Sequence, residues 1–148
     1  MGHKANLLGA IRSTRAEVDD FVRAHQGEPD AEIGGGWTLH DALAHIALWD
    51  RMAARKLTGA PLPEGEELAA AEDWDLDTFN DEMRARWRDR PMGEVMGEYI
   101  AAYLAVDTAM EQASDDDCAP GTRLWRAIAD DNAGHYPAHF PVRDRFSA

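Results

Sequence analysis

The chain has 148 residues, 45% of them hydrophobic, a size that predicts one compact domain over residues 1–148 and is too small for two. Its formal net charge of -13 at pH 7 argues against a nucleic-acid partner, because the fifteen Lys and Arg residues form no basic patch. No apolar run approaches the ~20 residues of a membrane span, no signal-peptide core is visible and there is a single cysteine, so we expect no membrane contact and a cytoplasmic location.

The first predicted helix covers residues 6–25, where apolar residues recur at intervals of three, four and seven. This spacing forms one apolar stripe along a helix. Gly27 and Pro29 end the helix, because glycine accepts a left-handed cap and proline cannot continue the hydrogen-bond ladder. The charged residues of the segment are assigned to the side that faces water: Arg12, Arg15, Glu17, Asp19, Asp20 and Arg23.

The second predicted helix covers residues 38–58 and follows three consecutive glycines. Thr38 can accept a hydrogen bond from the first turn, and Asp41, three residues later, can complete a capping box. At about 100° per residue, His45 lies at the edge of the apolar face, while His40 lies on the opposite side and is expected to be solvated. A side chain at that edge can reach a pocket while its helix still packs, so His45 is the first candidate functional residue.

The middle of the chain contains a loop and two further helical segments. Residues 60–75 are rich in Pro, Gly and acidic residues, and they are interpreted either as a surface crossover held by Trp74 or as a lid. A third helix is predicted from Asp77 to near Pro91, and a longer one starts at Pro91. The two segments are either separate helices or one kinked element.

The last predicted helix is capped by Thr122 and carries Asp131 and His135 on its inner face. No segment alternates apolar and polar residues with period two, so no strand is predicted. The predicted architecture is therefore an all-α bundle with four main helices.

Three histidines form a candidate metal site. His135 and His139 are four residues apart, the spacing that places two imidazoles on one face of a helix. With His45 they would provide three nitrogen donors inside the bundle and leave coordination positions open, as in catalytic sites. Nitrogen donors favour zinc or nickel, with iron as a further candidate, whereas magnesium and calcium prefer oxygen.

Two observations leave the ligand set open. Pro137 lies between the paired histidines and interrupts a regular helix, which changes the geometry of the pair. Asp131 is four residues before His135, so it is either a rival third ligand or an acceptor that orients an imidazole. The alternative for His45 is a packed, hydrogen-bonded core histidine.

Several short motifs resemble the DinB-like four-helix bundle superfamily, and within it most closely the ClbS/DfsB family, over nearly the whole chain. The motifs are Trp37-Thr38, Leu43-Ala44-His45-Ile46 with Trp49, Phe79-Asn80-Asp81-Glu82, and Asn132, His135-Tyr136 and His139. The resemblance implies an up-up-down-down bundle in which many members hold a divalent metal at the positions of His45, His135 and His139. Metal-binding relatives include S-transferases that use low-molecular-weight thiols and a maleylpyruvate isomerase. The ClbS branch is associated instead with opening a strained cyclopropane electrophile, and no metal is expected in that chemistry.

Three functions from different classes follow from these features. The leading hypothesis is a metal-dependent small-molecule transferase or hydrolase, such as a thiol S-transferase, that acts on an electrophile, with Asp131 or Asp50 as base or as an outer hydrogen-bond partner. The second is a metal-free ClbS/DfsB-type protein that binds or hydrolyses a reactive metabolite. The third is a non-enzymatic, stress-linked bundle that forms a homodimer.

Overall fold

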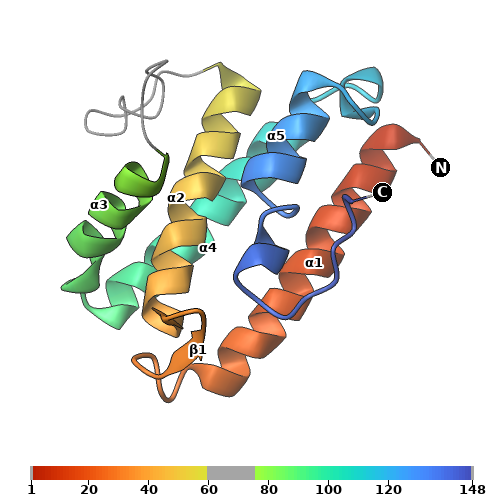
Figure 1. The fold of residues 1–148 in the computed structure, drawn as a ribbon. Helices are drawn as coiled ribbons and strands as arrows, with labels where there is room; N and C mark the ends of the chain where they lie inside the picture. Colours follow the sequence, from red (N-terminus) through yellow and green to blue (C-terminus); the bar gives the residue numbers. More distant parts are fainter. Residues whose placement is uncertain (1, 60–75, 148) are drawn as a thin grey trace.

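The computed structural model describes residues 2–59 and 76–147, and in these ranges the chain is mostly helical (Figure 1). The helices are α1 (His3–His25), α2 (Leu39–Thr58), α3 (Leu76–Arg88), α4 (Met92–Glu111) and α5 (Arg123–Asp131). The remaining elements are strands β1 (Glu32–Gly34) and β2 (Trp37–Thr38) and the 3-10 turns η2 (Asp116–Cys118) and η3 (Tyr136–Ala138). The predicted all-α bundle is confirmed. The predicted crossover or lid at residues 60–75, with Trp74, lies outside the described residues.

Helix α2 is the central element of the bundle. It packs against α3, α4 and α5, and every residue from Leu39 to Asp50 is buried. Helices α1 and α5 run in one direction and α2 and α4 in the other (Figure 1). Among these four helices, the second and third along the chain, α2 and α4, are therefore parallel to each other. The up-up-down-down order implied by the resemblance would instead make the first and second helices parallel. None of the described helices is both long and apolar enough to cross a membrane.

Local sequence signals set the ends of α2 as predicted. The Thr38 hydroxyl accepts from the Asp41 backbone N–H at 3.1 Å, and the Asp41 carboxylate accepts from the Thr38 N–H at 3.3 Å, which completes the capping box. At the other end, Gly59 adopts the left-handed conformation with φ 72° and caps Arg55. Helices α3 and α4 are separate helices, and Pro91 is the N-cap of α4.

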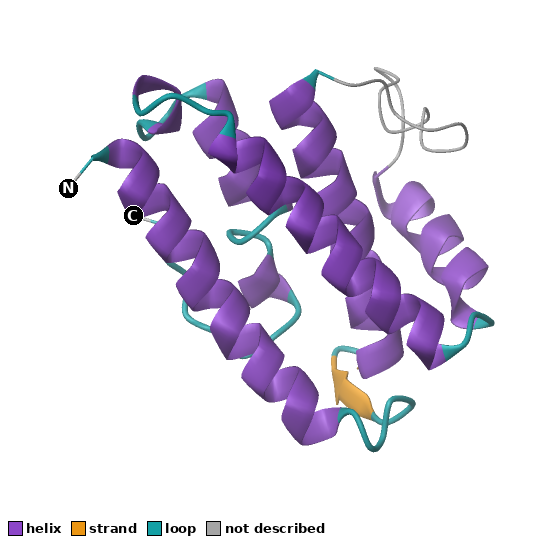
Figure 2. Ribbon diagram, turned by 180° about the vertical axis from the view of Figure 1, so that it is seen from behind, coloured by secondary structure: helices purple, strands orange, loops and turns teal. Residues whose placement is uncertain are grey.

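The prediction that the chain has no strand is wrong at one place. Strands β1 and β2 form a small antiparallel hairpin before α2 (Figure 2). With three and two residues, they are too short to show an alternating pattern. Gly35 and Gly36, with φ of 59° and 82°, form the turn, a backbone conformation that glycine adopts at little cost.

Two polar residues assigned to the solvent are buried. Arg15 on α1 is only 4% exposed, and it shares a stripe with Ile11, Val18 and Val22, all of which are buried. His40 on α2 is 8% exposed, and its Nε2 lies 2.7 Å from the carbonyl oxygen of Arg90. Arg15 was assigned by its polarity, although its position places it in the apolar stripe of α1. His40 was assigned by its position opposite the apolar face, where the segment that contains Arg90 covers it.

Candidate metal centre

The three candidate histidines come from two separate parts of the chain. His45 projects from the buried middle of α2. His135 and His139 flank the turn η3, because α5 ends at Asp131 instead of continuing to His135 as predicted. Pro137 lies within η3, so a 3-10 turn takes the place of the predicted helical pair. The structure nevertheless brings the three imidazoles together.

The imidazoles converge through their Nε2 atoms. The Nε2 of His135 is 3.2 Å from that of His45 and 3.1 Å from that of His139. Nitrogen ligands at 2.0–2.1 Å from a tetrahedral zinc ion lie about 3.3 Å apart. Among the described residues, this is the cluster of His, Cys, Asp and Glu side chains that can hold a metal ion, with ligand atoms within 4.8 Å of one another. The donor set and its spacing therefore fit a divalent metal.

The histidines are held in their neutral form. Burial, followed by the proximity of His135 and His139, lowers the pKa of His45 from 6.5 to about 2. Burial, followed by the proximity of His139, lowers the pKa of His135 to about 4, and burial also lowers the pKa of His139. A neutral imidazole has the free lone pair that a metal requires, so the cluster is ready to bind a cation near neutral pH.

Aromatic side chains surround the cluster. The Trp37 ring lies 5.0 Å from the rings of both His45 and His139, and the Trp49 ring lies 6.4 Å from His45 and 6.2 Å from His135, measured between centroids. A cavity of about 400 Å³ adjoins His139 and is lined by Trp37, Pro137 and the glycines of the hairpin. The site thus has apolar walls and a space of the size that small ligands occupy.

A family model described as the mycothiol maleylpyruvate isomerase N-terminal domain matches residues 9–138. The chain belongs to this family. The family is part of the DinB-like helical superfamily, which confirms the resemblance at that level, while closeness to the ClbS/DfsB branch stays a prediction. No curated protein and no solved structure matches the chain. Domains of this type often bind metal ions, in agreement with the histidine cluster.

The two carboxylates predicted near the site have protein partners of their own. Asp131 is 5% exposed and forms an ion pair with Lys56, and it is not part of the three-histidine cluster. Asp50 is fully buried and contacts Arg15, Tyr136 and Asn132. These contacts assign each carboxylate to a defined hydrogen-bond network, and a role as base or as outer hydrogen-bond partner stays a prediction for both.

The contacts that hold Trp37 in place were not predicted from the sequence. The Arg84 guanidinium on α3 lies 4.6 Å from the centre of the Trp37 ring, and it donates to the Gly36 carbonyl at 2.7 Å and to the Asp41 carboxylate at 2.9 Å. Burial raises the pKa of Asp41, but the hydrogen bonds from Arg84 and Thr38 lower it by a larger amount, so the net shift of the pKa is downward. The capping box alone does not predict this contact, because the Thr38 N–H already satisfies the Asp41 carboxylate locally and Arg84 lies 43 residues away.

Proposed function

We propose that this protein is a metal-dependent enzyme that adds a low-molecular-weight thiol, or water, to a small electrophile. The observation that carries the proposal is the convergence of His45, His135 and His139, in neutral form. Of the three, His139 lines a cavity of about 400 Å³. The family's name refers to mycothiol, which supports a thiol as the co-substrate. Thiol S-transfer is therefore the preferred reaction and hydrolysis the second.

The histidines would hold a zinc or nickel ion through Nε2. Such an ion supplies Lewis acidity, which lowers the pKa of a thiol or a water so that a nucleophile exists near neutral pH. With three protein ligands, coordination positions remain for reactants, as in catalytic zinc sites.

Other residues of the chain would shape the reaction space. Trp37 and Trp49 border the histidines and exclude water from one side of the cluster, which strengthens electrostatic interactions there. Pro137 and the hairpin glycines leave room beside His139 for an electrophile. Asp50 already accepts hydrogen bonds from Tyr136 and Asn132, so its contacts favour holding that network over taking a substrate proton.

The proposal is tested with the zinc-loaded and the chelator-stripped protein, each incubated with mycothiol and maleylpyruvate. Isomerisation is followed by absorbance, and a second electrophile, monochlorobimane, reports thiol transfer by fluorescence. We expect turnover only with both thiol and metal, and its loss in the His139→Ala variant. His25→Ala is the control, because His25 is exposed on α1 and lies outside the cluster.

Other outcomes point to other functions. Consumption of the electrophile by the loaded protein without thiol would favour the hydrolase. Consumption or tight binding of an electrophile by the stripped protein would favour the metal-free ClbS/DfsB-type alternative. Inactivity of both forms toward both electrophiles would contradict the proposed thiol transfer to these substrates.

A further inference from the structure

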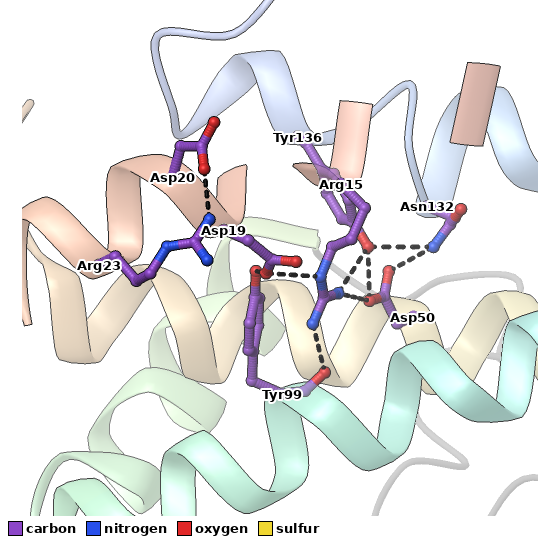
Figure 3. A network of polar contacts seen from close by, with 8 residues as sticks. All are labelled: Arg15, Asp19, Asp20, Arg23, Asp50, Tyr99, Asn132 and Tyr136. Carbon is purple, nitrogen blue, oxygen red and sulfur yellow. Dashed lines mark hydrogen bonds and ion pairs between the residues drawn. The ribbon is translucent and has the colours of Figure 1, made fainter. Parts of the chain in front are cut away.

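A buried polar network crosses the bundle (Figure 3), and one of its members, Tyr136, directly follows His135 in the sequence. Its centre is the ion pair between Arg15 of α1 and Asp50 of α2, whose side chains are 5% and 0% exposed. Tyr136 and Asn132, both fully buried, join it from the C-terminal segment, and α4 contributes the Tyr99 carbonyl, which accepts from Arg15 at 3.0 Å. Four separate parts of the chain therefore meet at one set of hydrogen bonds.

The Tyr136 hydroxyl uses its full hydrogen-bonding capacity in this network. It donates to the Asp50 carboxylate at 2.8 Å, and it accepts from Arg15 at 3.1 Å and from Asn132 at 3.2 Å. Asn132 also donates to Asp50 at 2.8 Å. Burial raises the pKa of Asp50 to about 7, although Arg15, Tyr136 and Asn132 act in the opposite direction. The contacts from these three donors match acceptor oxygens on Asp50. The phenol is thus fixed at a single position.

This bond connects the two segments that carry the histidines. Tyr136 directly follows His135 and precedes His139 by three residues, and Asp50 follows His45 by five residues on α2. The Tyr136 hydroxyl bond to Asp50 therefore ties the turn η3 to the helix that provides the third imidazole.

The turn needs such an anchor. Helix α5 ends at Asp131, so no continuous helix holds His135 and His139 in register. A metal-ligating histidine is usually oriented by an acceptor on its second ring nitrogen. The buried Nδ1 of His135 has no such partner among the described residues. The position of His135 therefore depends on the backbone that carries it and on packing against the Trp49 ring.

We infer that Tyr136, held by Asp50 and Arg15, is a positioning residue that sets the distance between the imidazoles of η3 and His45. This inference rests on the proposed metal site. Tyr136 does not touch the reacting atoms and acts through the histidines on either side of it. Buried ion pairs contribute little net stability compared with apolar packing, so a role in defining a specific geometry is a physical reason for placing one here.

The test compares Tyr136→Phe with Tyr99→Phe. Tyr99 is 1% exposed, and its hydroxyl donates to the Asp19 carboxylate at 2.6 Å. It lies on α4, and the substitution keeps the backbone carbonyl through which Tyr99 accepts from Arg15. Each substitution removes one buried hydroxyl that donates to a carboxylate, so the loss of a buried tyrosine hydroxyl is common to both variants. Only Tyr136→Phe removes the anchor of η3.

The first readout is metal binding by the purified full chain. Zinc affinity is measured by competition with a chromophoric chelator, and Co²⁺ absorption between 500 and 700 nm reports coordination geometry. We expect Tyr136→Phe to weaken zinc binding about 10- to 100-fold, the range seen for outer-sphere partners of metal ligands, and to change the Co²⁺ spectrum. Tyr99→Phe should keep the wild-type affinity and spectrum.

The second readout needs no metal. In the chelator-stripped protein, nuclear Overhauser contacts between the rings of His45 and His135, whose centroids lie 5.0 Å apart, report their proximity. We expect these contacts in wild type and Tyr99→Phe and their loss in Tyr136→Phe. If wild type bound no metal, the proposed function would fail, while the ring contacts would still decide the role of Tyr136.

Two results would overturn the inference. The first is equal zinc affinity and equal ring contacts in wild type and Tyr136→Phe. The second is failure to fold, by circular dichroism, of both Tyr136→Phe and the isosteric Asp50→Asn, because the network would then be a requirement of the fold and not of the site. If Asp50→Asn folds and Tyr136→Phe does not, zinc affinity and the contacts between the His45 and His135 rings are measured in Asp50→Asn. We expect weaker zinc binding and loss of the ring contacts in that variant.

Discussion

The metal-free protein should lose stability as the pH falls below 6.5, because its native state keeps His45 and His135 neutral. Burial lowers their pKa values to about 2 and about 4, from 6.5 in the unfolded chain. Below pH 6.5 the unfolded state binds protons that the native state does not, so this stabilisation is complete above 6.5 and declines toward the folded pKa values. Each pH unit in that window costs about 1.4 kcal/mol per histidine.

The contribution of His45 to the pH dependence of the unfolding free energy can be measured separately by substituting this residue. Over the two pH units from 6.5 to 4.5, its contribution falls by roughly 2 to 3 kcal/mol. Urea unfolding in the presence of chelator, at both pH values, gives the free energy of unfolding for wild type and His45→Gln. Between the two pH values, the free energy of unfolding should fall by this amount more in wild type than in His45→Gln, because the other titrating groups are common to both proteins. His3→Gln, a change of an exposed histidine, should match wild type. Equal losses in wild type and His45→Gln would refute the reasoning.

Two further predictions concern the segments that position the site. Thr38→Ala should lower the free energy of unfolding by about 1 kcal/mol, because the capping box of α2 is lost, and an unchanged urea midpoint would contradict this. Gly134→Ala should destabilise by roughly 1 to 3 kcal/mol, because the new Cβ would lie 2.0 Å from the Ala129 carbonyl oxygen. Gly9→Ala, at an open position within α1, should instead stabilise by about 0.5 to 1 kcal/mol, so similar thermal midpoints for the two glycine variants would rule out the predicted clash.

The features predicted correctly from the sequence depend on local rules. The start of α2 follows from Thr38 and Asp41, which interact three residues apart and need no other part of the chain. The position of His45 at the edge of the apolar face follows from helical periodicity, and the structure buries it beside the other two histidines. The pairing of His135 with His139 survives the change from helix to turn, because both geometries bring residues four apart close together.

The features that were missed depend on tertiary contacts. Arg15 is buried because Asp50, 35 residues away, and the Tyr99 carbonyl, 84 residues away, satisfy its guanidinium. Helix α5 ends early where Gly134 approaches the backbone of Ala129 and shortly before Pro137. The proline is visible in the sequence, whereas the approach of Gly134 to Ala129 is not visible in the helical pattern. The sequence sign of the Arg15 network is a charged residue, Arg15, within the apolar stripe of α1.

Zinc titration of the chelator-stripped protein by calorimetry tests the central claim most directly. Wild type and His25→Ala, which changes an exposed histidine outside the cluster, should bind one ion per chain. His45→Ala, His135→Ala and His139→Ala should lose that binding while their helical circular dichroism stays unchanged, because an open three-ligand site is not the main source of this domain's stability. Absence of zinc binding by folded wild type, or equal binding by wild type and His45→Ala, would contradict the assignment of this cluster as a metal centre.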